Sequence, residues 1–206
     1  MAPPPLLVTA FEPFGDLASN PSEAVLARLP PRVAGHPVRR AVLPVDSLIA
    51  PAQLRGLLDV HQPCRLLLLG VAPNRAALCP ERQARNLLDF RIPDNGGHQP
   101  RARPIVPGAP NHLPTTWPLD PMLEAAPWGD APVRPSDDAG EFLCNLVYYH
   151  ALRIAPPTTL TLFVHLPPDD RLAASRKGGP CVPLGIQTPA ILAMLTFGLG
   201  DPAPAP

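Results

Sequence analysis

The chain has 206 residues, and its 17 lysines and arginines balance its 17 acidic residues, so its formal net charge is zero. This balance argues against a nucleic-acid-binding surface, whose affinity comes mainly from clustered positive charge. Hydrophobic residues make up 46% of the chain and charged residues 17%, which is typical of a globular protein rather than a disordered one. The length suits a single domain, which we expect over residues 1–200, with 201–206 as a frayed tail.

No targeting or membrane segment is visible in the sequence. The N-terminus MAPPPLLVTAF lacks the basic start and long apolar run of a signal peptide. The longest apolar runs, such as LLLLGVA at 66–72, are far too short to span a bilayer. The 34 prolines fall mostly between apolar segments, where they punctuate loops. We therefore expect a soluble, cytoplasmic protein that binds neither membrane nor nucleic acid.

The first half of the chain alternates strand-like and helix-like segments. Short apolar runs at 6–11, 38–45 and 64–72 predict strands, and the last of these is apolar throughout, as in a strand buried on both faces. Between them, 20–29 and 47–60 have apolar residues at helical spacing, and Pro21 and Ser22 are helix-start signals.

The second half continues the same alternation after a long irregular stretch. Residues 77–90 could extend the sheet, and 91–116 are rich in turns and prolines. The remaining predictions are a strand at 159–167 and helices at 117–126, 140–154 and 188–199. This order predicts an α/β fold, namely a single-domain α/β/α sandwich with a mostly parallel central sheet, like those of phosphorylases and hydrolases.

Four cysteines stand alone, without any CxxC pair: Cys64, Cys79, Cys144 and Cys181. Zinc sites usually show close Cys or His pairs, so we expect no metal, and a cytosolic chain of this size is not expected to contain disulfides. Each cysteine is by default a reduced thiol, and any role for Cys64, Cys79 or Cys181 stays open.

Cys144 lies in GEFLCNLVYYH, near the start of the predicted helix 140–154. A cysteine among apolar residues is usually a packing residue. A helix start, however, offers unsatisfied amides and the positive end of the dipole, which lower a thiol pKa. In open α/β sheets such helix starts point to the ligand site at the carboxyl ends of the strands. The residues alone leave packing and nucleophilic attack both open.

A nucleophilic cysteine needs a base and commonly a third group that orients the base. His165 ends the apolar strand TLTLFV, where a site is expected, although a strand-end histidine can also be purely structural. Glu81 follows a buried-looking run, and the arginines of ERQARN could instead hold it in a structural ion pair. Asp89 and Asp94 are rival carboxylates, but Asp94 lies in PDNGG, a turn sequence.

Four segments in chain order resemble the type I pyroglutamyl peptidases, also called pyrrolidone carboxyl peptidases. VTAFEPFG with NPSEAV (8–25) is similar to the N-terminal signature of that family. GVAPNR with PERQARNLLDFRIPDNGGHQP (70–100) is similar to its glutamate region. DDAGEFLCNLVYYHAL (137–152) resembles its cysteine region, and FVHLPP (163–168) its histidine region. The resemblance covers nearly the whole chain.

The resemblance implies a Cys-His-Glu triad without a cofactor. Cys144 would be the nucleophile, His165 the general base and acid, and Glu81 the group that orients His165. The implied reaction removes an N-terminal pyroglutamyl residue from a peptide through a thioester. The implied substrate-binding residues are Phe11 and Phe14 around the lactam ring, Ile92 and Leu143 as further walls, Val71, and Arg91 near the oxyanion. A homotetramer is also implied.

One loop departs from the family pattern. Bacterial members often carry a glutamine and paired glycines where this chain has Val71, Pro73 and Asn74. Valine cannot donate the hydrogen bond of a glutamine, and Pro73 removes a backbone N–H. This departure motivates an alternative in which the chain binds pyroglutamyl peptides without efficient turnover. A nucleoside-processing enzyme is a weaker alternative, because the glycines and basic residues for phosphate are not in the matching places.

Overall fold

The computed structural model describes residues 3–125, 128–176 and 178–200, so the predicted tail lies outside the described residues. A six-stranded sheet forms the centre, with the strand order β2-β3-β1-β4-β8-β5. Its strands are β1 (Leu6–Phe11), β2 (Arg32–Val33), β3 (His36–Leu43), β4 (Arg65–Val71), β5 (Cys79–Pro80) and β8 (Leu160–Leu166). A two-stranded sheet pairs β6 (Gln83–Arg85) with β7 (His112–Pro114).

The central sheet is mostly parallel, as predicted. Strands β3, β1, β4 and β8 run parallel to one another, and the short strands β2 and β5 join the two edges antiparallel. All residues of β4 are buried, which explains why this segment is a continuous apolar run. Parallel strands need crossover connections, and helices supply them here.

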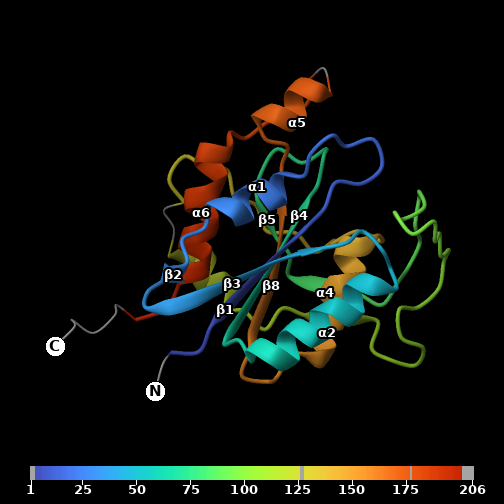
Figure 1. The fold of residues 1–206 in the computed structure, drawn as a ribbon, viewed down its shortest axis with the longest axis horizontal. Helices are drawn as coiled ribbons and strands as arrows, with labels where there is room; N and C mark the ends of the chain where they lie inside the picture. Colours follow the sequence, from blue (N-terminus) through green and yellow to red (C-terminus); the bar gives the residue numbers. More distant parts are fainter. Residues whose placement is uncertain (1–2, 126–127, 177, 201–206) are drawn as a thin grey trace.

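Helices cover both faces of the sheet, which makes the fold a single-domain α/β/α sandwich (Figure 1). The helices are α1 (Pro21–Arg28), α2 (Ile49–His61), α3 (Leu119–Glu124), α4 (Leu143–Ile154), α5 (Asp170–Ser175) and α6 (Leu184–Thr196). Alternate residues of β1 enter two different apolar cores because side chains alternate along a strand. Leu6 and Val8 pack with α1 and α6, and Leu7 and Phe11 pack with α2 and α4.

The observed helices and strands differ from the predicted ones mainly in their boundaries and in the segment 77–116. Only part of 77–90 extends the central sheet, since β5 pairs with β8 while β6 pairs with β7, which lies inside the predicted irregular stretch. The short elements β2 and α5 were not predicted. Helix α6 begins at Leu184, before the predicted start, and contains Pro189, because buried apolar residues of this segment hold it against the sheet.

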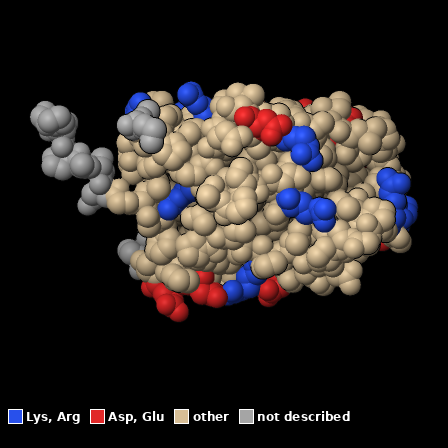
Figure 2. All heavy atoms as spheres, turned by 90° about the horizontal axis from the view of Figure 1, so that it is seen from below, with Lys and Arg blue, Asp and Glu red and all other residues tan. Residues whose placement is uncertain are grey.

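The surface carries both charge signs in small groups. On the face drawn in Figure 2, arginines lie scattered among acidic residues and a larger area of uncharged ones. None of the helices within the described ranges is long and apolar enough to cross a membrane.

Helix α4 is tied to the β6 region by one buried side chain. The amide group of Asn145 is fully buried, and its Nδ2 donates to the carbonyls of Arg85 and Leu87 at 2.8 and 3.0 Å. Its Oδ1 accepts from the Arg85 N–H at 2.8 Å. Asn145 thereby supplies hydrogen-bond partners for three backbone groups at the end of β6. It follows Cys144 directly in the chain.

We predict that Asn145→Ala lowers the free energy of unfolding by about 2–4 kcal/mol, because it leaves buried backbone groups without partners. Urea denaturation measures the loss. Arg153→Ala, on the exposed side of the same helix, is the matched control and should change stability by no more than about 0.5 kcal/mol. An equal effect of the two substitutions would contradict this role of Asn145.

Candidate active site

A buried carboxylate and an imidazole meet at the carboxyl end of the sheet. Glu81 follows β5 and is fully buried, and its Oε1 lies 2.6 Å from Nδ1 of His165 on β8. A carboxylate only accepts hydrogen bonds, so Nδ1 carries the proton and Nε2 is left as the basic nitrogen. The backbone holds Glu81 on both sides, since its N–H donates to the Phe163 carbonyl and its C=O accepts from Tyr148 Oη.

Cys144 is the second residue of α4, so its thiol lies in the first turn of the helix, as predicted. Its Sγ lies above Gly70 of β4, which is the register partner of His165 in the sheet. A Cβ at position 70 would come within 2.9 Å of this Sγ and 2.8 Å of the Phe163 ring. Only glycine therefore leaves room for the thiol beside His165.

One cavity brings the two reactive groups together. Cys144 and His165 both line a hollow of about 390 Å³, whose other walls include Phe14, Ala72, Arg75, Phe142 and the loop 139–141. Within the described residues no hydrogen bond joins Cys144 Sγ to His165. Catalytic hydrogen bonds are often long in ligand-free enzymes and tighten when substrate binds. The arrangement is therefore that of a nucleophile, a base and an orienting carboxylate at one hollow.

The acidity of Cys144 differs from the sequence-based expectation. Burial, followed by the neighbouring Glu81 carboxylate, raises the pKa of this thiol to about 12, and the Arg75 guanidinium partly opposes this shift. The favourable helix start does not outweigh this desolvation. The raised pKa favours the neutral thiol near neutral pH, so a nucleophilic role for Cys144 would require a base that takes its proton during attack.

The cation that pairs with Glu81 is Arg75, outside the ERQARN segment. Arg75 Nη1 lies 2.5 Å from Glu81 Oε1. Arg82 instead pairs with Asp120 at 2.7 Å, and Arg85 pairs with Asp138 at 2.8 Å. The expectation that the arginines of ERQARN hold Glu81 is therefore wrong, because their side chains leave the carboxylate and pair with acids that are largely exposed.

The two rival carboxylates have other partners. Asp89 lines the cavity, but its Oδ1 pairs with Arg101 Nε at 3.0 Å. Asp94 forms the turn predicted for PDNGG, with Oδ1 accepting from the His98 N–H and Oδ2 from the Ser47 N–H. Burial opposes ionisation of Asp94, but the hydrogen bonds from Ser47 and His98 outweigh it and lower the Asp94 pKa.

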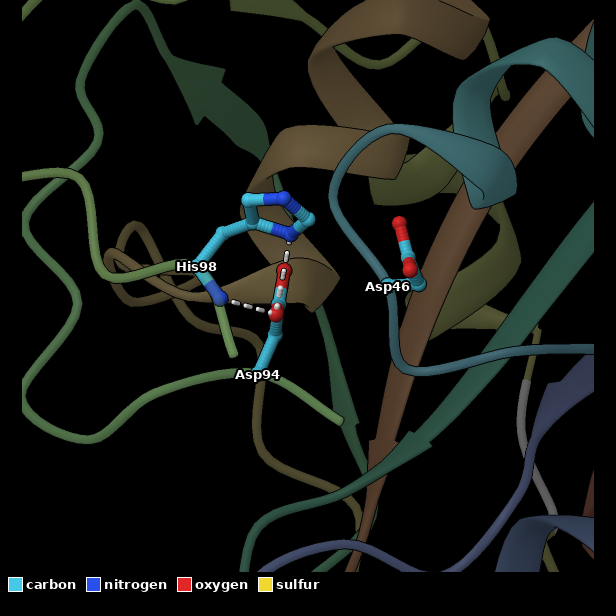
Figure 3. Close-up of side chains that lie close together, drawn as sticks. All are labelled: Asp46, Asp94 and His98. Atoms are coloured by element: carbon cyan, nitrogen blue, oxygen red, sulfur yellow. Dashed lines mark hydrogen bonds and ion pairs between the residues drawn. The ribbon is translucent and has the colours of Figure 1, made fainter. Parts of the chain in front are cut away.

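Asp46, Asp94 and His98 lie together, close enough for one cation to bridge them (Figure 3). Their atoms already have structural partners, however. Asp46 Oδ1 accepts from the N–H groups of Leu48 and Ile49 at the start of α2. The buried Asp94 accepts two backbone N–H groups and lies 3.4 Å from His98 Nδ1. Through these contacts the three residues connect the start of α2 with the 94–98 turn.

Comparison with known proteins places this geometry in a family. The model of the family described as "Pyroglutamyl peptidase" matches residues 5–197. The chain belongs to the pyroglutamyl peptidase family. The crystal structure of pyrrolidone carboxyl peptidase from Thermus thermophilus is 45% identical, covers 92% of this chain and 98% of its own, and has a TM-score of 0.87.

Other relatives agree. The pyrrolidone-carboxylate peptidase of Coprothermobacter proteolyticus is 36% identical over 166 residues, which is 79% of this chain and 80% of the relative. The structure from Thermococcus litoralis is 28% identical, covers 99% of this chain and all of its own, and has a TM-score of 0.89. The resemblance seen in the four sequence segments is thus confirmed for the chain as a whole.

The predicted substrate-binding residues divide between two adjoining hollows. Phe14 and Val71 line both of them, whereas Ile92 and Arg91 line only the larger cavity. Phe11 and Leu143, almost fully buried, line a much smaller apolar hollow of about 10 Å³ on another side of Cys144. The structure therefore brings all of these residues near the Cys144 thiol. Between these two hollows, however, Ile92 and Arg91 line one, and Phe11 and Leu143 line the other.

Sequence reasoning missed two residues of the site. Phe142 lines both hollows, with its ring centroid 5.5 Å from that of Phe14 and 4.6 Å from that of Phe90. Its position just before Leu143 and Cys144 was a signal in the sequence. Arg75 is the last residue of GVAPNR, and no local pattern in the sequence connects it with Glu81.

The loop that departs from the family pattern is braced by a second arginine. Arg176, at the end of α5, donates to the Pro73 carbonyl and, at 3.2 Å, to Asn74 Oδ1. The Ala72 carbonyl accepts from the Arg75 N–H at 3.0 Å, which closes a turn over Pro73 and Asn74. The loop is thereby ordered although it lacks the paired glycines.

We predict that Gly70→Ala lowers the free energy of unfolding by about 1–3 kcal/mol, because the added methyl group overlaps Cys144 Sγ and the Phe163 ring. In a Cys144→Ala background the same substitution should cost less, since one of the two overlaps is gone. Urea denaturation of the four proteins measures this coupling. Gly56→Ala, where a Cβ meets nothing within 4 Å, is the control and should not destabilise. An identical cost in both backgrounds would contradict the contact.

We predict that iodoacetamide modifies Cys144 of the ligand-free protein slowly near neutral pH. The raised pKa keeps the thiol protonated beyond the ordinary thiol value of about 8.5, so the rate should keep rising above that pH. The exposed Cys181 provides the comparison within the same protein, and mass spectrometry of the two peptides measures both rates. Selective modification of Cys144 at acidic or neutral pH would instead indicate a preformed thiolate–imidazolium pair.

Proposed function

We propose that the protein is a cysteine exopeptidase that hydrolyses the bond after an N-terminal pyroglutamyl residue, with Cys144, His165 and Glu81 as its catalytic triad. One observation carries this proposal, namely the 2.6 Å contact between His165 Nδ1 and the buried Glu81 at the cavity that also holds Cys144. Membership of the pyroglutamyl peptidase family supports the choice of substrate.

The triad would work in two half-reactions. Cys144 Sγ attacks the carbonyl carbon of the pyroglutamyl residue while its proton passes to His165 Nε2. His165 then protonates the departing amine as the C–N bond breaks, which leaves a thioester. A water that gives its proton to His165 cleaves this thioester, and pyroglutamate leaves as the thiol is reprotonated. Glu81 keeps the imidazole in the required tautomer and stabilises it when it is charged.

The developing oxyanion needs donors near the attacked carbon. The first turn of α4 has no side-chain cap, so its N–H groups next to Cys144 are available at the cavity. Uncapped amides at a helix start favour negative charge. Arg91 lines the same cavity from an exposed position, and we propose it as a secondary donor or as a support of the site geometry.

We propose that the lactam ring enters the smaller, apolar hollow between Phe11, Phe14, Phe142 and Leu143. In the ligand-free state this hollow has about 10 Å³, room for roughly one water molecule. A lactam ring needs more room than that. Phe14 and Phe142 are only partly buried and close the hollow by their mutual contact, so ring binding requires these two rings to separate.

The remainder of the peptide would lie in the open hollows next to the ring site. A third hollow, of about 540 Å³, continues from the main cavity and shares Phe14, Arg91 and Ile92 with it. The departing loop residues Pro73 and Asn74 form part of its wall, so in this proposal they would lie beside the leaving group. Val71 supplies an apolar wall where the family often has glutamine.

The comparisons give no support to the alternative of binding without efficient turnover. The relatives and structures described above are named as peptidases, and the triad residues of this chain are all present. We further propose a cytoplasmic location and the homotetramer implied by the resemblance. The exposed apolar side chains Val42, Leu48 and Ile49, near the start of α2, support a contact between copies, and sedimentation analysis of the full chain tests it.

We predict that the reduced protein releases the leaving group from a chromogenic pyroglutamyl amide, and that Cys144→Ala abolishes this release. The reason is that no other described thiol shares the cavity with His165. A spectrophotometric assay measures the rate.

Two controls sharpen the assay. Cys181→Ala removes an exposed thiol outside the described cavities and should leave the rate unchanged. A prolyl amide with the same leaving group lacks the lactam carbonyl and should be a poor substrate. No turnover by the folded, reduced wild-type protein, or full turnover by Cys144→Ala, would refute the proposed function.

A further inference from the structure

We propose that Arg75 is a positioning residue of the triad, which pairs with the Glu81 carboxylate and orients it so that His165 presents Nε2 to Cys144. This inference rests on the proposed function and deepens it. Arg75, the last residue of the unusual GVAPNR loop, would thereby act on the reaction through the orientation of Glu81 and His165.

The geometry of the Glu81 carboxylate is asymmetric. Oε1 receives both Arg75 Nη1, at 2.5 Å, and His165 Nδ1, at 2.6 Å. Oε2 is buried and has no hydrogen-bond partner among the described residues. Two donors on a single oxygen determine the rotation of the carboxylate, and this in turn determines where the imidazole ring lies.

Because the Glu81 carboxylate is buried, it needs the positive charge of Arg75 as a partner. The Glu81 side chain has 0% exposure and His165 only 6%, so water does not stabilise a negative charge on this carboxylate. An ionised carboxylate in such a place is stable only when it is paired and hydrogen-bonded. A neutral His165 supplies one hydrogen bond but no charge, so Arg75 is the charge partner in the resting protein. A protonated Glu81 would lose its role as acceptor for Nδ1.

Arg75 also reaches the approach to the nucleophile. Its Nη2 donates to the Asp138 carbonyl at 2.6 Å, and Asp138 lies in the loop that leads into α4. The same guanidinium thus connects the triad carboxylate with the segment that positions Cys144. A planar guanidinium can make both contacts at once, and a lysine ammonium, with a single nitrogen, can keep the charge but not the paired geometry.

The charges of Arg75 and Glu81 also act on neighbouring titratable groups, which contribute to the pH dependence. The titratable or charged groups that face Glu81 are Arg75, His165, Cys144, Cys79 and Tyr148. The Arg75 guanidinium lowers the pKa of Cys144 and of Cys79, whereas Glu81 raises both. Loss of Arg75 therefore leaves both thiols harder to ionise.

The test compares Arg75→Gln and Arg75→Lys with the wild type in the pyroglutamyl amide assay over a range of pH. Arg75→Gln should lower kcat by about 100-fold with little change in KM, because it misplaces groups that act on the reacting atoms. The acid limb of its kcat/KM profile should move to higher pH. Arg75→Lys keeps the charge, so it should hold the acid limb near its wild-type position and recover part of kcat.

Arg82→Gln is the matched control. Arg82 adjoins Glu81 in the chain, but its side chain pairs with Asp120 at the surface, so kcat and the pH profile should stay as in the wild type. Urea denaturation of each variant identifies any loss of folding, and Arg75→Lys keeps the test decisive if Arg75→Gln does not fold.

A second readout does not depend on turnover. The ¹⁵N signals of the His165 ring report its tautomer, which should be the Nδ1–H form in the wild type and a mixture in Arg75→Gln. If the wild type fails to cleave pyroglutamyl amides, the proposed function is refuted, and these signals still decide the role of Arg75. The inference is overturned if Arg75→Gln keeps the wild-type tautomer and pH profile, or if it changes only KM or only stability.

Discussion

The site depends on one constraint, which is that the fully buried Glu81 carboxylate must find its polar partners within the protein. Glu81 has no contact with water, and groups from three parts of the chain surround it. His165 comes from β8, Arg75 from the turn after β4, and Tyr148 from α4 donates to its backbone carbonyl. If any of these elements moved, Glu81 would lose a hydrogen-bond partner of its carboxylate or of its backbone, so its burial couples the sheet, the loop and α4.

The same burial explains the resting state of the nucleophile. Cys144 lies at a helix start, where the dipole favours a thiolate, yet desolvation and the nearby Glu81 charge favour the neutral thiol, and they dominate. Apolar surroundings suit a flat, uncharged lactam ring, so under the proposed function the features that would bind the substrate also favour the neutral thiol. A positioned base is then required for attack, which ties the chemistry to the orientation of His165.

Close packing beneath the site limits what the chain can vary. Gly70 leaves the space that Cys144 Sγ occupies beside His165, and Asn145 anchors the next residue of the helix to the β6 segment. The loop over Pro73 and Asn74 has diverged from the family pattern, but Arg176 and the turn to Arg75 keep it ordered. The departures therefore lie both at the wall of the third hollow, with Pro73 and Asn74, and at the hollows that Cys144 lines, with Val71.

Local patterns in the sequence determined most of the secondary structure. A strand buried on both faces must be almost wholly apolar, as β4 is apart from Arg65, and a helix such as α2 must present an apolar stripe. Motif order also pointed to Cys144, His165 and Glu81 before any contact was known. Only the tertiary structure decided which arginine pairs with Glu81, because Arg82 and Arg85 are closer in the chain but face other acids, while the turn at 72–75 returns Arg75 to the carboxylate. It also decided the direction of the Cys144 pKa shift and the contact between Phe14 and Phe142 at the smaller hollow, since desolvation and side-chain contacts depend on neighbours brought together from distant parts of the chain.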